Sequence, residues 1–129
     1  MIDAQRVDFV SIPVRDKDEA ARFYEETLGF QRDPRATHAW PEYRVGETVL
    51  ALVVPTEIGW DFVPTPPAQI AIRVPDVGVA RAKLEEAGVE FTGETFDSGV
   101  CHMAFFKDPD GNGLMLHRRY AQFDDGSTP

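Results

Sequence analysis

The sequence has one cysteine and few basic residues, and each shortage excludes a class of site. Cys101 is the only cysteine, so no disulfide forms within the chain and no zinc site is built from several thiolates. Lys and Arg number 13 against 22 Asp and Glu, which gives a formal net charge of −9. Nucleic acid is therefore not an expected partner, because its phosphates require clustered cations.

The chain also lacks long hydrophobic stretches. No apolar run approaches the roughly 20 residues of a membrane span, and residues 1–6 lack the basic and apolar regions of a secretion signal. The 129 residues are 43% hydrophobic, which is enough for one domain with its own core. We therefore expect a cytoplasmic protein, with no membrane partner, whose acidic surface keeps it in solution.

The two halves of the chain resemble each other. A short strand ends at Val14 and is followed by Asp16, and the same pattern recurs at Val74 and Asp76. Each Asp is placed to accept hydrogen bonds from the free N–H groups in the first turn of a helix. The pattern therefore predicts a strand followed by a capped helix, twice.

Apolar residues at helical spacing follow both Asp residues. They are Ala20, Ala21, Tyr24 and Leu28 in the first half, and Val77, Ala80, Leu84 and Ala87 in the second. Gly29 and Gly88 come next, and glycine commonly ends a helix. Short apolar runs then follow, over residues 40–45, 48–54, 100–106 and 114–117, with a strong turn signal at Asp108–Asn112.

Each half therefore reads as a strand, a helix and about three strands. The predicted fold class is α+β: two tandem βαβββ modules that form a curved mixed sheet around a cleft. We place the first module at about residues 7–54 and the second at about 68–120 of one domain. The proline-rich residues 55–67 form the predicted linker.

Four stretches resemble the vicinal-oxygen-chelate superfamily of glyoxalases, bleomycin-resistance proteins and dioxygenases. They are Pro13–Asp16, Ala21–Phe30, Ala71–Val77 and Phe105–Asn112. The phrases Phe-Tyr-x-x-x-Leu-Gly-Phe and Asp-Pro-Asp-Gly-Asn are together fairly specific for this family, and the resemblance spans about residues 7–120. It implies the paired-module fold and a homodimer. It does not specify a reaction, because members include several kinds of enzyme and metal-free antibiotic-binding proteins.

The resemblance also marks four positions for metal ligands. In metal-dependent members each module supplies two ligands, which are His, Glu or sometimes Gln. The corresponding residues here are Phe9, Ala51, Gln69 and Met115. Divalent ions require imidazole or carboxylate donors, which these four side chains do not provide. We therefore expect no metal, no cofactor and no catalytic residue at these positions.

Alternation along the strands selects the side chains that would face the cleft, and loop aromatic residues would form its walls. The predicted ligand-binding residues are Phe9, Ser11, Trp40, Tyr43, Ala51, Trp60, Phe62, Gln69, Arg73, Met103, Phe105, Met115 and His117. An apolar floor with aromatic walls suits a large, flat, partly aromatic molecule. Together with the resemblance to metal-free members, this favours sequestration of a bleomycin-, mitomycin- or enediyne-like antibiotic, and hence resistance.

Three alternatives stay open at this point. A displaced metal site around His102 and His117, with Glu57 or Asp61, would suit a lyase, isomerase or dioxygenase. The face of the sheet that carries His102 depends on a hairpin register that the sequence does not determine. His117 with Arg73 or Gln69 would instead perform acid–base chemistry without a metal. A regulatory or scaffold domain with a filled cleft is the third alternative.

Overall fold

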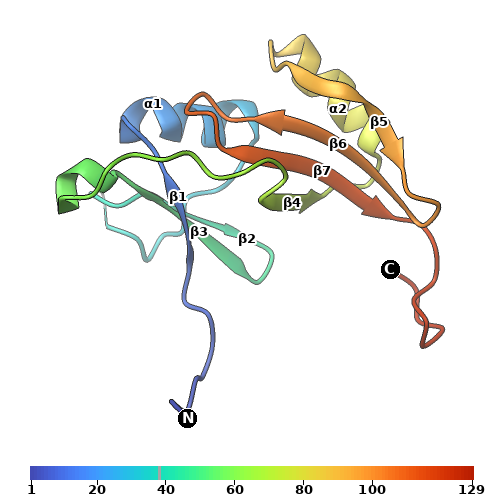
Figure 1. The fold of residues 1–129 in the computed structure, drawn as a ribbon, viewed down its shortest axis with the longest axis horizontal. Helices are drawn as coiled ribbons and strands as arrows, with labels where there is room; N and C mark the ends of the chain where they lie inside the picture. The colour runs from blue at the N-terminus through green and yellow to red at the C-terminus, as the bar shows by residue number, and fades with distance from the viewer. Residues whose placement is uncertain (38) are drawn as a thin grey trace. The chain divides into compact units, whose positions relative to one another are not determined.

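The computed structural model describes residues 1–37 and 39–129. The chain forms two compact units, Met1–Val63 and Pro64–Pro129, and their boundary falls inside the predicted linker. Each unit has a β-sheet with a helix packed against one face (Figure 1). Among the described residues, no helix has both the length and the apolar character that a membrane span needs.

The first unit contains a three-stranded sheet and one helical segment. Its elements are β1 (Val10–Pro13), α1 (Lys17–Arg22), the π-helical turn η1 (Phe23–Thr27), β2 (Glu42–Val45), β3 (Thr48–Val53) and the 3-10 turn η2 (Pro55–Ile58). The strand order is β1-β3-β2, with β1 parallel and β2 antiparallel to β3. As predicted, Asp16 caps α1, accepting hydrogen bonds from the N–H groups of Asp18 at 2.9 Å and Glu19 at 3.0 Å.

The core of the first unit lies between the sheet and its helix. Its buried residues include Ile12, Ala20, Ala21, Tyr24, Tyr43, Leu50 and Leu52. Tyr43 stacks on Tyr24 with 6.0 Å between ring centroids and donates a hydrogen bond to Glu25 Oε2 at 3.2 Å. Burial raises the pKa of Tyr43 to about 12, so its hydroxyl stays protonated. Tyr43 is a core residue, and the prediction that it forms a wall of the ligand site is wrong.

The first unit has two strands after its helix where about three were predicted. The only trace of another strand in the described part of this unit is an isolated bridge between Arg32 and Tyr43. The chain turns immediately afterwards, because the Asp33 carboxylate accepts a hydrogen bond from the Arg35 N–H at 2.9 Å. Pro34 lies inside this turn and has no N–H group with which to continue a ladder.

The second unit repeats this topology with one more full strand. Its elements are β4 (Ile70–Arg73), α2 (Val77–Glu86), β5 (Phe91–Asp97), β6 (Cys101–Lys107) and β7 (Gly113–Arg119). The strand order is β4-β7-β6-β5, and β4 is parallel to β7 as β1 is to β3. Asp76 caps α2 through the N–H of Val79 at 2.9 Å. The predicted α+β class and the repeated module order are therefore confirmed.

The Asp108–Asn112 turn joins β6 to β7 and also fixes the segment that precedes β4. The Asp108 carboxylate accepts hydrogen bonds from the N–H of Asp110 and from both the N–H and the side-chain amide of Asn112, at 2.8–2.9 Å. Asn112 Oδ1 accepts a hydrogen bond from the N–H of Thr65 at 2.9 Å, and the Gly113 N–H donates to Thr65 Oγ1 at 3.1 Å. The family-like turn is therefore a structural clamp within the second unit.

A substitution at Gly113 tests this clamp. A Cβ atom there would lie 2.6 Å from Pro67 Cα and 2.7 Å from Ala68 N, both backbone atoms, so Gly113→Ala cannot be accommodated without moving the chain. We expect urea unfolding to give a free energy of unfolding lower by about 1–3 kcal/mol. Gly78→Ala on α2 is the control, because its new Cβ meets only Asp76 Oδ1 at 3.4 Å. Equal stability of the two variants would contradict this account.

Candidate functional site

Each sheet has a face opposite its helix, which we call the far face. On the first far face Ser11 and Glu42 both pair with Ala51, and Arg44 pairs with Val49. Paired residues of neighbouring strands point to the same side of a sheet. Because Leu50 and Leu52 are in the core against α1, these alternate residues define the far face of the first unit.

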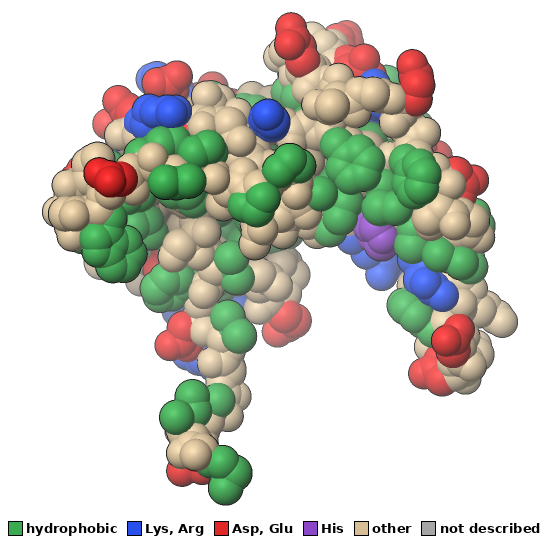
Figure 2. All heavy atoms as spheres, in the orientation of Figure 1, with side chains coloured by type: hydrophobic (Ala, Val, Ile, Leu, Met, Phe, Trp, Pro, Cys, Tyr) green, Lys and Arg blue, Asp and Glu red, His purple; other side chains and the backbone are tan. Residues whose placement is uncertain are grey.

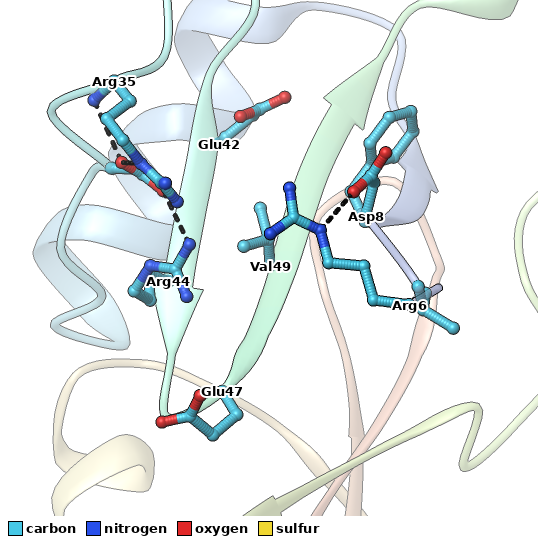
Figure 3. Close-up of a pocket in the computed structure, with 10 residues that line it drawn as sticks. Arg6, Asp8, Arg35, Glu42, Arg44, Glu47 and Val49 are labelled. Atoms are coloured by element: carbon cyan, nitrogen blue, oxygen red, sulfur yellow. Dashed lines mark hydrogen bonds and ion pairs between the residues drawn. The ribbon is translucent and has the colours of Figure 1, made fainter. Parts of the chain in front are cut away.

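A pocket of about 500 Å³ lies on the first far face (Figure 3). Figure 3 shows Arg44 on β2 beside Val49 on β3, with Arg6 and Asp8 of the N-terminal segment across the pocket. Its walls carry three arginines and four carboxylates, and Phe9 and Val49 are among its few apolar residues. The lining of this pocket is therefore mainly charged, in contrast to the apolar floor that was predicted.

One buried carboxylate organises the charges of this pocket. Asp33 is only 4% exposed and accepts hydrogen bonds from Arg35 Nε and Nη2 at 3.3 and 3.2 Å. Arg44 Nη2 lies 3.4 Å from the same carboxylate. The hydrogen bonds from Arg35 lower the pKa of Asp33 to about 2, so the group is ionised at neutral pH. The sequence analysis did not predict this cluster. Alternation along residues 42–44 could have indicated part of it, because a buried Tyr43 requires Glu42 and Arg44 to point to the far face.

The second far face is more apolar. One row across its strands consists of Ala71, Met115 and Phe105, which are paired in register. The next row consists of Arg73, His117 and Met103. The opposite face carries the core residues Ala104, Leu114 and Leu116. The prediction that Met115 and His117 share a face is therefore correct, and Met103, Phe105 and Arg73 lie with them.

A pocket of about 290 Å³ lies on this far face, lined by Arg73, Cys101, His117, Arg119, Phe123 and Pro129. Arg119 holds the segment after β7, donating to the carbonyl oxygens of Ala121 at 2.9 Å and Gln122 at 2.7 Å. Its guanidinium carbon also lies 4.5 Å from the centre of the Phe123 ring. Neither Arg119 nor Phe123 was among the predicted site residues, because their placement depends on how the chain folds after β7.

His102 lies on the opposite face of the sheet from His117. His102 pairs with Arg118 and Met103 pairs with His117, so consecutive residues of β6 put the two histidines on different sides. His102 Nε2 is 3.5 Å from Asp97, whose pKa is lowered by hydrogen bonds from the Gly99 N–H and the Tyr120 hydroxyl. The alternative of a metal site shared by His102 and His117 is therefore wrong.

The predicted loop aromatic residues lie at the surface of the first unit. Trp40 is 40% exposed and Trp60 is 69% exposed. The Phe62 ring is half-buried beneath Arg15, whose guanidinium carbon lies 4.0 Å from the ring centre. Trp40 also has a cationic neighbour, because Lys17 Nζ lies 5.8 Å from the centre of its ring. Of the predicted wall residues, Trp60 is therefore the one with the most open ring surface.

Comparison with known proteins identifies the family. Residues 6–116 match the Glyoxalase/Bleomycin resistance protein/Dioxygenase superfamily. The chain therefore belongs to this superfamily. No curated protein matches it in sequence.

Three solved structures illustrate the likeness. TnmS3, an antibiotic binding protein from Streptomyces sp. CB03234, is 29% identical over 92% of this chain and 99% of its own, with a TM-score of 0.74. A glyoxalase/bleomycin resistance protein from the same strain is 33% identical over 84% of this chain and 96% of its own, with a TM-score of 0.65. A superfamily member from Sphaerobacter thermophilus DSM 20745 is 28% identical over 88% and 97%, with a TM-score of 0.74.

The positions that correspond to metal ligands in metal-dependent members do not fit a divalent ion. Ala51 lies on the first far face, and Phe9 lines the pocket there. Met115 lies on the second far face, and Gln69 immediately precedes β4. A phenyl ring and a methyl group have no donor atom, a thioether is a weak soft donor, and one neutral amide oxygen cannot hold a catalytic metal.

The Asp33 cluster predicts a dependence of stability on pH. Because folding lowers the pKa of Asp33 from 3.8 to about 2, its stabilisation is fully present above the unfolded value and is lost as pH falls toward the folded value. Asp33→Asn should therefore lower the free energy of unfolding at pH 7, and its deficit relative to wild type should narrow between pH 4 and pH 2.

Urea unfolding over a pH series measures this difference. Asp124→Asn, which changes a carboxylate in the exposed C-terminal segment, is the control for the loss of one negative charge. A deficit for Asp33→Asn that stays constant down to pH 2 would contradict the assigned role of the carboxylate.

Proposed function

We propose that this protein binds a small, partly aromatic antibiotic without changing it covalently, and that it confers resistance by sequestering the compound. The observation that carries the proposal is the replacement of metal-donor side chains by Phe9, Ala51 and Met115 on or beside the far faces. The similarity to TnmS3, an antibiotic binding protein, supports the same conclusion.

The second far face is suited to a flat apolar molecule. Met103, Phe105 and Met115 are neighbours in its register, and each is only partly buried. Flexible thioether side chains adapt to irregular ligands and form favourable contacts with aromatic rings. An aromatic side chain adds area without much loss of conformational freedom. On the first unit, Trp40 and Trp60 supply further exposed ring surface.

Acid–base catalysis by His117 is the second candidate, because Arg73 is its register neighbour and both line the same pocket. A catalytic histidine is usually oriented by a carboxylate that accepts its second N–H. The lining of this pocket contains no Asp or Glu. Binding without catalysis therefore agrees better with the arrangement.

A ligand panel tests the proposal. We expect at least one bleomycin-like, mitomycin-like or anthraquinone-fused enediyne compound to bind with micromolar or tighter affinity in isothermal titration calorimetry. A ligand at 100 times its dissociation constant should stabilise the fold by about 2.7 kcal/mol, visible as a rise in melting temperature. Mass spectrometry should recover the compound unchanged. If no compound of the panel bound, the proposal would be contradicted. Recovery of a chemically modified compound would instead favour catalysis by His117.

A matched pair of variants locates the binding surface. Phe105→Ala removes a ring from the second far face and should weaken binding about tenfold, which equals about 1.4 kcal/mol. Val79→Ala truncates a side chain that is 53% exposed on α2, and it should bind like wild type. Circular dichroism verifies that both variants fold. If they bound equally well, the second far face would not be the contact surface.

We also propose that the protein is a cytoplasmic homodimer. A single cysteine suits a reducing compartment. Ile2, Val7 and Phe9 are exposed by 89%, 78% and 50%, and a second copy would cover apolar surface of this kind. Sedimentation equilibrium should therefore give twice the mass of one chain. A monomer at the concentrations of the binding assays would contradict the dimer without affecting the binding proposal.

A further inference from the structure

The pocket on the second far face is cationic although the protein as a whole is strongly acidic. Arg73, His117 and Arg119 line it, and no carboxylate side chain does, while the chain carries a formal net charge of −9. Its remaining lining side chains are those of Cys101, Phe123 and Pro129. On the face seen in Figure 2, a histidine lies beside basic side chains, with hydrophobic side chains next to them.

The three cationic or potentially cationic groups are not equivalent. Arg119 is committed to the carbonyl oxygens of Ala121 and Gln122 and to the ring of Phe123. The side chains of Arg73 and His117 have no hydrogen-bond or ion-pair partner anywhere in residues 1–37 and 39–129. The two are nevertheless register neighbours on β4 and β7. Their donor groups therefore remain available to a ligand.

We propose that this pocket binds an acidic group, a carboxylate or an acidic phenol, carried by the aromatic ligand. This inference rests on the proposed function and specifies the ligand class. The Arg73 guanidinium is always charged, and its planar N–H groups match two acceptor oxygens. His117 donates a further N–H from the neighbouring strand. Met103 lies in the same row and adjoins Phe105 and Met115, the side chains proposed to pack against the aromatic ring of the ligand.

Electrostatics favour an anionic ligand over a neutral or cationic one at this place. Arg73 is exposed, so it attracts an anion through charge-assisted hydrogen bonds whose strength falls as salt is added. A cationic group would be repelled by Arg73 and Arg119, whose two positive charges outnumber the single terminal carboxylate of Pro129 among the lining residues. The pocket therefore discriminates by charge, and the methionine and phenylalanine side chains contribute affinity that does not depend on charge.

A pair of ligands that differ only in charge tests this inference. Anthraquinone-2-carboxylate and anthraquinone-2-carboxamide are titrated into the full chain by calorimetry. We expect wild type to bind the carboxylate about tenfold more tightly than the carboxamide, because one charge-assisted hydrogen bond contributes about that much to affinity. Added salt should reduce the preference. Arg73→Gln should abolish it, and Arg73→Lys should retain part of it, because the charge remains but the paired donors are lost.

Lys83→Gln is the matched control, since it removes one exposed cation from α2 of the same unit. It should keep the full preference, and thermal unfolding verifies the fold of every variant. Equal binding of the two ligands to wild type would overturn the inference while leaving aromatic binding in place. Loss of the preference in Lys83→Gln as much as in Arg73→Gln would also overturn it. If neither the carboxylate nor the carboxamide bound to wild type, both this inference and the proposed function would be overturned.

Discussion

Leu50 and Leu52 on β3 pack toward α1, and Leu114 and Leu116 on β7 do the same toward α2. Because successive side chains of a strand alternate between faces, Ala51 and Met115 are then obliged to point away from the helices. The rest of the structure depends on this alternation in the two central strands. The burial of four leucines by their helices thus fixes the two positions where a metal-dependent relative would have ligands, and this chain has no strong donor at either.

The repeat, the Asp16 and Asp76 caps and the far-face position of His117 could be predicted because each follows from spacing along one segment. The face of His102 could not, since it depends on the register between β6 and β7, and a shift of one residue reverses it. Tyr43 was misplaced because its ring was assigned to the wall of the cleft although residues 40–45 were predicted as a strand, and the pairing of β2 with β3 turns that ring into the core.

The loss of donors also changes where binding energy can come from. A metal site gains affinity from a few short, directional bonds, whereas a face of methionine and phenylalanine gains it from area removed from water. Such a surface tolerates variation in the ligand and cannot by itself polarise a bond. For a ligand on this face, specificity would therefore have to come from the polar side chains of Arg73 and His117, which lie in the same row as Met103.

The two pockets use arginine in different ways, and this difference decides which cations are available for recognition. On the first unit, Asp33 is 4% exposed and pairs with both Arg35 and Arg44, so an incoming anion would have to compete with a buried carboxylate. On the second unit, Arg119 is held by backbone carbonyls, which orient its guanidinium without neutralising it. Within the described residues, 1–37 and 39–129, the Arg73 side chain has neither kind of partner. A negative ligand therefore gains most beside Arg73, although the first pocket contains more arginines.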